Sequence, residues 1–263
     1  MFKFCSLYSG SSGNSLFVQT DNTKILVDAG ESAKKIETAL NSIDVDINEI
    51  DAVLVTHEHT DHIKGLATIS KKFNIPIYAN KETWEAMPQV AEKTLNQNLF
   101  NVNENFEIGD LKVIPFSIPH DAANPCGFNI FYNNQKISIA TDIGHMDKAI
   151  IKNLEGSSFV LLEANYDPNI LAYSRYPYSL KQRIAGPNGH LSNEAAGKTI
   201  SCLLNSGLQN VMLGHLSKES NFPELAYKTV IDELCANNFD ENKIKVGIAN
   251  RSNPSEILNL EVS

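Results

Sequence analysis

Three histidines and one aspartate lie within six residues of the chain, in the motif His57-Glu58-His59-Thr60-Asp61-His62. The motif follows an apolar run at residues 52–56, which predicts a buried strand, and it precedes a predicted helix at residues 62–73. Neutral imidazole and carboxylate side chains are ligands of divalent transition metals. Because the spacing differs from the helical H-E-x-x-H pattern, we interpret the motif as a metal-binding loop whose alternating side chains can face two ions.

Three further candidate ligands follow along the chain, each at the end of a predicted strand: His120, Asp142 and His215. Loops at strand ends gather at one edge of a sheet, where binding and catalytic residues are common. Taken singly, each of the three is more often an ordinary polar loop residue. Their order after the first motif makes a shared metal site the stronger interpretation.

That order resembles the metallo-β-lactamase-fold superfamily, in which an early Asp, H-x-H-x-D-H, a His, a bridging Asp and a final His succeed one another. The early Asp is here Asp28. The resemblance implies one metal held by His57, His59 and His120, and a second held by Asp61, His62 and His215. It also implies that Asp142 bridges the two ions and that Asp28 orients ligands from behind them.

A pair of divalent ions about 3.5–4 Å apart generates hydroxide near neutral pH and holds both the attacking and the leaving oxygen of a displacement. Two such ions carry more charge than two Asp ligands, and neutral His ligands add none, so the centre stays positive. A positive centre favours phosphodiesters over neutral amides, and thioesters remain an alternative. Asp61 is thus a predicted catalytic residue as well as a ligand.

The resemblance is closer still to the YycJ (WalJ/VicX) subfamily, over nearly the whole chain. It is carried by Ser9-Gly10-Ser11-Ser12-Gly13-Asn14-Ser15, Asp28-Ala29-Gly30, Thr56-His57-Glu58-His59, His120-Asp121-Ala122, Arg175-Tyr176-Pro177 and Gly189-His190-Leu191-Ser192-Asn193-Glu194. It implies a 5′ to 3′ DNA exonuclease that uses two divalent ions, Mn or Zn, with Fe as a further option. The chain departs from the pattern at Pro119 and at His145, and we interpret His145 as a surface residue.

His190 is a second predicted catalytic residue. The tetrapeptide Gly189-His190-Leu191-Ser192 is repeated as Gly214-His215-Leu216-Ser217, and it precedes a predicted helix N-terminus that can face an anion. In-line cleavage needs a proton for the leaving oxygen, so we interpret His190 as a proton-donating or phosphate-binding residue. The alternative is a local turn in which Ser192 caps the helix.

Two segments supply predicted substrate-binding residues: Ser9, Ser11, Ser12 and Asn14 in the first, and Arg175, Tyr176 and Lys181 in the second. The first segment is rich in small residues whose backbone N–H groups can approach a phosphate, although it is equally a tight turn. The second places cations beside tyrosines that can stack on a strand end, and a solvated helix face is its alternative reading.

Strand-like and helical segments alternate in two halves of the chain, which predicts the α/β (α+β) class. Buried strands joined by amphipathic helices need helices outside a sheet, so two packed halves give a four-layer αββα metallo-β-lactamase sandwich. No linker divides the 263 residues, and we expect one domain over residues 1–263.

Composition limits the partners. The net charge of -9 opposes a broad phosphate-tracking surface, so any nucleic-acid contact must be local, and DNA is favoured over RNA by the resemblance. The N-terminal residues lack a secretory apolar core and no run of 18 apolar residues occurs, so we expect a cytoplasmic protein that does not enter membranes. A protein partner cannot be predicted.

Four other functions remain open or are disfavoured. A small-molecule phosphodiesterase or a glyoxalase-type thioester hydrolase would use the same metals with a different pocket, and a non-catalytic metal-binding regulator would keep the ligands without turnover. Only 72 residues separate Asp142 from His215, which is too few for the inserted domain of RNA-processing β-CASP members.

Overall fold

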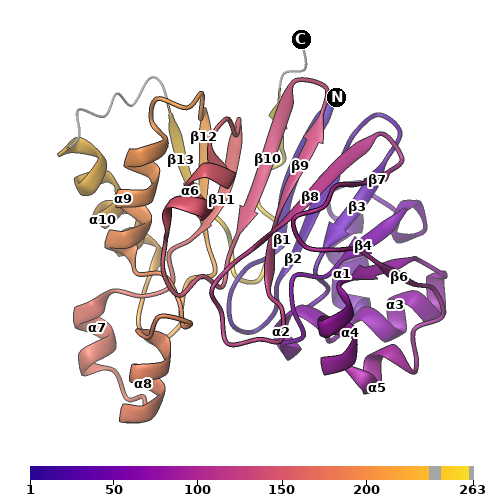
Figure 1. Ribbon diagram of the computed structural model, residues 1–263, viewed down its shortest axis with the longest axis horizontal. Coiled ribbons are helices and arrows are strands. Elements are labelled where there is room, and N and C mark those ends of the chain that lie inside the picture. Colours follow the sequence, from indigo (N-terminus) through magenta and orange to yellow (C-terminus); the bar gives the residue numbers. More distant parts are fainter. Residues whose placement is uncertain (237–243, 261–263) are drawn as a thin grey trace. The chain divides into compact units, whose positions relative to one another are not determined.

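The computed structural model describes residues 1–236 and 244–260 (Figure 1). Backbone contacts divide the chain into two compact units, the first made of residues 1–117, 122–135 and 250–263 and the second of residues 118–121 and 136–249. The expectation of one domain over residues 1–263 stays a prediction. Among the described residues, no helix is long and apolar enough to cross a membrane.

The first unit contains a mixed sheet of seven strands in the order β14-β1-β2-β3-β4-β5-β6. Its strands are β1 (Phe2–Tyr8), β2 (Ser15–Gln19), β3 (Lys24–Val27), β4 (Ala52–Leu54), β5 (Ile77–Ala79), β6 (Gln97–Leu99) and β14 (Leu258–Leu260). Neighbours from β14 to β3 pair antiparallel, and those from β3 to β6 pair parallel. The carboxyl ends of β3 and β4 therefore lie side by side.

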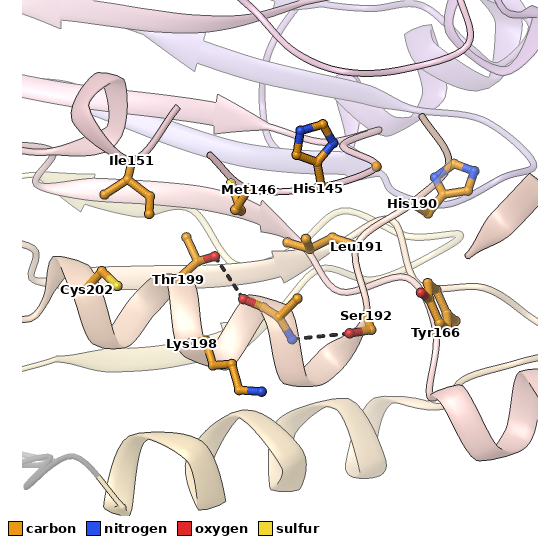
Figure 2. A pocket seen from close by; sticks show the side chains of 12 residues that line it. His145, Met146, Ile151, Tyr166, His190, Leu191, Ser192, Lys198, Thr199 and Cys202 are labelled. Carbon is orange, nitrogen blue, oxygen red and sulfur yellow. Dashed lines mark hydrogen bonds between the residues drawn. The ribbon is translucent and has the colours of Figure 1, made fainter. Parts of the chain in front are cut away.

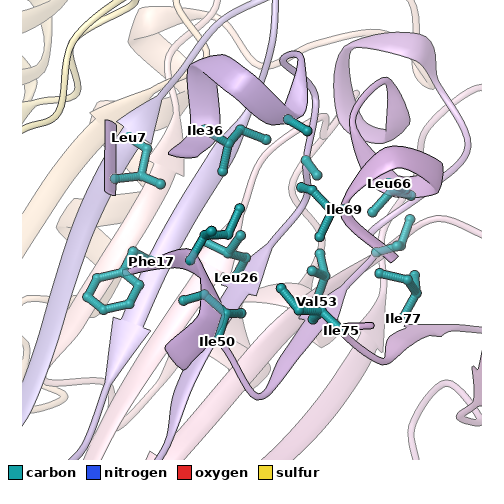
Figure 3. Close-up of a cluster of buried hydrophobic side chains, with 14 of the residues drawn as sticks. Leu7, Phe17, Leu26, Ile36, Ile50, Val53, Leu66, Ile69, Ile75 and Ile77 are labelled. Carbon is teal, nitrogen blue, oxygen red and sulfur yellow. The ribbon is translucent and has the colours of Figure 1, made fainter. Parts of the chain in front are cut away.

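Helices cover this sheet and bury its apolar side chains (Figure 3). They are α1 (Ala33–Asn41), α2 (Thr60–Ile63), α3 (Leu66–Phe73), α4 (Lys81–Ala86) and α5 (Pro88–Ala91), with a 3-10 turn at Ile47–Glu49. Ile36 of α1 and Ile69 of α3 pack with Val53 of β4 in one core cluster, and all three are fully buried. Burying each such side chain stabilises the fold by about 1.5–3 kcal/mol.

The helix predicted over residues 62–73 is divided into α2 and α3. The division falls at Gly65, whose N–H donates to Ala29 O at 2.8 Å. A Cβ on Gly65 would lie 2.4 Å from Glu31 O, so only glycine allows this close approach to the segment after β3. The interruption turns the chain just after the His motif.

Three antiparallel strands complete the first unit: β7 (Phe106–Ile108), β8 (Leu111–Ser117) and β9 (Cys126–Tyr132). Phe100 stacks on Phe106 with ring centroids 5.3 Å apart and meets Phe128 edge-on at 5.6 Å. Aromatic pairs in these geometries add to the energy of burial.

The second unit is built on four parallel strands in the order β13-β12-β11-β10. They are β10 (Gln135–Ala140), β11 (Phe159–Glu163), β12 (Asn210–Gly214) and β13 (Lys245–Ile248), and the helices are α6 (Lys148–Leu154), α7 (Pro168–Tyr173), α8 (Tyr178–Ile184), α9 (Asn193–Leu203) and α10 (Pro223–Cys235). In Figure 1, α6, α9 and α10 lie along the strands, whereas α7 and α8 lie beyond their carboxyl ends. In this register Glu163 pairs with Gly214, which brings Glu163 and His215 to one edge.

Candidate metal centre

The first cluster of candidate ligands comprises Asp28, His57, His59, Asp61 and His62, all in the first unit. Asp28 follows β3, is buried, and accepts from Thr56 N at 2.9 Å through Oδ1. Its Oδ2 accepts from Thr56 Oγ1 at 2.9 Å and lies 2.8 Å from His62 Nδ1. A carboxylate at Nδ1 fixes the tautomer in which the Nε2 of His62 carries a lone pair. This geometry supports the predicted orienting role of Asp28.

His57 and His59 face each other across 3.1 Å, measured from His57 Nε2 to His59 Nδ1. Two nitrogens bound to one tetrahedral ion at about 2.0–2.1 Å each lie roughly 3.3 Å apart. His62 is close by, with its ring centroid 4.1 Å from that of His57. The donors of the first cluster therefore fit a divalent ion.

Asn14 holds Asp61 and His62 in place. Its backbone N–H donates to Asp61 O at 2.8 Å, and its side-chain nitrogen lies 3.3 Å from Asp61 Oδ2 and 3.0 Å from His62 Nε2. Its Oδ1 accepts from Gly10 N at 2.9 Å, which links the two ends of the turn between Gly10 and Asn14. These contacts favour a positioning role for Asn14, whereas the exposed Ser11 and Ser12 are accessible to a substrate. Ser9 is buried.

The second cluster comprises His120, Asp142, Glu163, His190 and His215, all in the second unit. The ligand atoms of Asp142, Glu163, His190 and His215 all lie within 4.8 Å of one another. His215 Nδ1 is 2.8 Å from Glu163 Oε1 and 3.4 Å from Asp142 Oδ1. Because Glu163 Oε1 is engaged by His215 Nδ1, the donors here that suit a divalent ion are Asp142 and the other ring nitrogen of His215.

His120 is held by the backbone of the segment that carries His190. Its Nδ1 lies 3.0 Å from Gly189 O, which makes Nδ1 the donor, and its Nε2 lies 3.7 Å from Asp142 Oδ1. Burial lowers the pKa of His120, and the charge of Asp142 opposes this only in part. The ring is therefore neutral near pH 7, as a metal ligand must be.

Three of the predicted site residues have left-handed backbone conformations: Asp28 at φ 62°, Asp142 at φ 59° and His215 at φ 54°. Each lies just beyond a strand of a parallel pair, where the chain must turn sharply. Asp, Asn and His enter this region more readily than other non-glycine residues, and such conformations cluster at functional sites.

Glu163 is a site residue that the sequence did not single out. It is fully buried, and its Oε1 lies 2.8 Å from the Nδ1 atoms of His190 and His215. Its Oε2 accepts from Ile143 N at 2.7 Å and from Leu191 N at 3.1 Å. Burial would raise the pKa of Glu163, but the two histidines lower it far below its usual range, so the carboxylate stays ionised. The available signal was a charged residue at the end of an apolar strand.

His190 is half-buried beside the same carboxylate. Burial would lower its pKa, but the charge of Glu163 and their hydrogen bond outweigh burial and raise the pKa above its ordinary value. Its Nδ1 is 3.7 Å from Asp142 Oδ1. His190 can therefore hold a proton on Nε2 close to a candidate ligand. His145 is exposed, and its Nδ1 lies 2.8 Å from Pro187 O.

The predicted substrate-binding residues Arg175 and Tyr176, in the loop between α7 and α8, and Lys181, on α8, differ in accessibility. Arg175 is exposed, but Tyr176 is partly buried against a small core of Tyr166, Leu171 and Ile184. Lys181 donates to Ala172 O at 2.7 Å, which leaves its remaining protons available. Fully accessible rings are instead those of Tyr173, 91% exposed, and Tyr178, 75% exposed.

Comparison with known proteins assigns the chain to a family. A model of the beta-lactamase superfamily domain matches residues 23–215. Exodeoxyribonuclease YycJ of Bacillus anthracis is 38% identical over 88% of this chain and 88% of its own. Exodeoxyribonuclease WalJ of Streptococcus pneumoniae serotype 2 is 37% identical over 89% of this chain and 88% of its own. The chain belongs to the YycJ subfamily of the metallo-β-lactamase superfamily.

Solved structures agree with this assignment of the fold. The metallo-β-lactamase fold protein YhfI of Bacillus subtilis matches with a TM-score of 0.72, at 16% identity over 97% of this chain and 99% of its own. A diphosphatase of the PhnP family matches with a TM-score of 0.68, at 19% identity over 98% of each chain. The predicted fold class, an αββα metallo-β-lactamase sandwich, is confirmed, and this YycJ-subfamily chain is a hydrolase.

Proposed function

We propose that the chain is a two-metal-dependent phosphodiesterase that degrades DNA from the 5′ end, in the cytoplasm. The names of the two full-length relatives support the substrate class, because both are exodeoxyribonucleases. The observation that carries the chemistry is the pair formed by Glu163 and His190 at 2.8 Å, next to the candidate ligand Asp142. It supplies a proton donor where phosphodiester cleavage needs one.

We propose the ligand sets that the order of the motifs along the chain implies. His57, His59 and His120 would hold one ion, Asp61, His62 and His215 the second, and Asp142 would bridge them. When bound, the two ions, Mn or Zn with Fe as a further option, supply the nucleophilic hydroxide and neutralise charge on the phosphate. Asp28 and Glu163 orient His62 and His215 through their Nδ1 atoms, at 2.8 Å each.

His190 donates the proton that the departing oxygen needs. The Glu163 carboxylate accepts from His190 Nδ1, which directs the other ring nitrogen, Nε2, away from the carboxylate. The same carboxylate raises the pKa of His190 above its ordinary value, so the imidazole carries two protons at pH values where most histidines are neutral. A protonated imidazole in this position protonates the alkoxide as the P–O bond breaks.

The DNA strand is bound locally, because the net charge of -9 opposes a broad contact. Arg175 in the loop between α7 and α8 and Lys181 on α8 supply cations, and the exposed rings of Tyr173 and Tyr178 supply stacking surfaces beside them. Stacking of a base on an aromatic side chain contributes about 1–3 kcal/mol without sequence preference. Ser11 and Ser12 are proposed to approach the phosphate backbone through their N–H groups.

Digestion of end-labelled substrates tests the function and its direction. Metal-free protein is reconstituted with Mn²⁺ or Zn²⁺ and incubated with duplex DNA, single-stranded DNA and RNA carrying a label at either end. We expect mononucleotides to appear from 5′-labelled DNA at once and from 3′-labelled DNA only at the end, and no cleavage by an Asp61→Ala control. Release from 3′-labelled ends first, or faster digestion of RNA, would contradict the proposed direction or substrate.

The net charge favours a second candidate, a hydrolase of small phosphodiesters or thioesters. With 31 Asp and Glu against 22 Lys and Arg, the chain repels a polyanion more strongly than it repels a small one. This candidate predicts turnover of bis(p-nitrophenyl) phosphate or of a glutathione thioester without digestion of DNA.

A further inference from the structure

A pocket of about 350 Å³ in the second unit begins at His190 and runs along α9 (Figure 2). His190 and Tyr166 lie at one end of it, and Ile151 and Cys202 lie at the other. Its volume lies within the range of small-molecule sites. The pocket therefore extends from the proposed proton donor along the surface of α9.

Between its two ends the pocket is mostly apolar. Leu191 and Met146 line it beside the imidazole of His145, Ile151 continues the apolar wall toward Cys202, and Leu191 is buried. The hydroxyls of the adjoining α9 turn are engaged within the helix, because Ser192 Oγ accepts from Ala195 N and Thr199 Oγ1 donates to Ala195 O. The Thr199 hydroxyl therefore has no proton left for a ligand, whereas the Ser192 hydroxyl keeps its proton. A flat apolar group fits this part of the pocket.

The charge of the pocket wall is opposite to that of the whole chain. None of the twelve described residues that line it is acidic, although the chain carries a net charge of -9. Lys198 is exposed on the pocket face of α9 and forms no ion pair with any residue that the structure describes. Lys198 lies six residues after Ser192, about 9 Å along the helix. Because helical side chains point toward the helix N-terminus, its side chain extends toward Ser192. An anion in the pocket would meet its ammonium group.

We propose that this pocket receives the 5′-terminal nucleotide of the DNA, with the base against Leu191, Met146 and Ile151 and the 5′-phosphate at Lys198. The inference rests on the proposed function. Hydroxide forms a new P–O bond to the second phosphate, the P–O3′ bond breaks, and His190 gives its proton to O3′. O3′ must lie within hydrogen-bond reach of His190, so the nucleotide that carries O3′ lies beside His190, where the pocket begins.

The reaction products are consistent with this placement of the 5′-terminal nucleotide. They are a nucleoside 5′-monophosphate, which leaves the pocket, and a shortened strand whose new 5′ end carries a phosphate. Each turn of the reaction thus regenerates the 5′-phosphate that Lys198 recognises. A 5′-phosphorylated end is therefore a better substrate than a 5′-hydroxyl end.

The thiol of Cys202 allows occupancy of the pocket to be measured without turnover. Cys202 lines the pocket and is exposed, Cys5 and Cys126 are buried, and a Cys235→Ser background removes the other exposed thiol. In the metal-loaded protein, 2′-deoxyadenosine 5′-monophosphate should slow maleimide labelling of Cys202 several-fold, deoxyadenosine should slow it less, and inorganic phosphate should leave it unchanged. An unchanged labelling rate with the nucleotide would overturn the proposal.

Variants of two lysines then test the phosphate contact. Lys198→Ala should remove the difference between the nucleotide and the nucleoside in the labelling experiment, whereas Lys152→Ala, an exposed lysine on α6 outside the pocket, should preserve it. If DNA is digested but the nucleotide does not protect Cys202, the pocket proposal fails and the nuclease stands. If the nucleotide protects Cys202 but DNA is not digested, the proposed function fails and the pocket remains a nucleotide site.

Discussion

One carboxylate oxygen of Glu163 lies 2.8 Å from Nδ1 of His190. The same oxygen is 2.8 Å from Nδ1 of His215, so a single buried group sets the orientation of a proposed proton donor and of a proposed metal ligand. Both rings must donate from Nδ1, which leaves Nε2 of His215 available to an ion. The proton donor and the ligand are thereby tied to one residue at the end of β11.

Glu163→Gln should lower DNA cleavage about 10–100-fold and weaken metal binding, because an amide N–H at this position forces both rings into the opposite tautomer. Cleavage rate and metal content, the latter by atomic emission, measure the two effects. Glu224→Gln on α10 is a matched exposed control and should change neither. A Glu163→Gln protein with wild-type metal content and rate would show that the carboxylate does not orient these ligands.

His190→Gln should lower the rate of DNA cleavage about 10²–10⁴-fold while the metal content stays unchanged, because only the proton for O3′ is lost. The defect should shrink greatly with bis(p-nitrophenyl) phosphate, whose nitrophenolate leaves without a proton. The ratio of mutant to wild-type rates on the two substrates is the measurement. Equal losses on both would mean that His190 does not act as the acid.

Gly30→Ala should disorder the His motif. A Cβ at Gly30 would lie 1.6 Å from Asp61 O and 2.5 Å from Asn14 N. Both are backbone atoms, which cannot move aside without distorting the chain. We expect a loss of about 1–3 kcal/mol or more in the free energy of unfolding, together with loss of metal. Gly247→Ala is the control, since the nearest atom to its Cβ is 3.9 Å away. Denaturant unfolding of both variants decides the prediction, and similar stabilities would contradict it.

Because of the buried Lys136, the free energy of unfolding should change with pH in the alkaline range. Burial lowers the pKa of Lys136 from 10.5 to about 8, although its ammonium donates to Asn153 O at 2.5 Å and Glu155 O at 2.8 Å. Between these pKa values the unfolded chain binds more protons than the folded one, so raising the pH stabilises the fold. From pH 8 to 10.5 the wild type should gain up to about 3 kcal/mol relative to Lys136→Met. A difference in the free energy of unfolding between the wild type and Lys136→Met that stays constant from pH 8 to 10.5 would contradict this prediction.

The sequence predicted the motif-bearing loops well because their chemistry is local. His57, His59 and His62 lie within one turn, and Asp142 and His215 each follow an apolar strand whose end is readable from the pattern. Parallel pairing then gathers strand ends at one edge, whatever the details of packing. The αββα class followed from the same alternation of strands and helices.

What the sequence did not show depends on contacts between distant residues. Glu163 reads as the polar end of a strand, and its role comes from His190 and His215, which lie 27 and 52 residues away. Asn14 reads as a turn residue, yet it contacts Asp61 and His62 across the chain. Strand β1 was not predicted either, because burial on both faces removes the alternation of polar and apolar residues.

Cleavage of DNA by protein of known metal content tests the central claim most directly. Wild type and Asp142→Asn are loaded with Mn²⁺, their bound ions are counted, and both are incubated with 5′-labelled duplex DNA. The account predicts that the wild type binds two ions and releases mononucleotides, whereas Asp142→Asn binds fewer ions and releases none. Wild-type protein that holds two ions and leaves DNA intact, or an Asp142→Asn protein that cleaves as fast as the wild type, would contradict it.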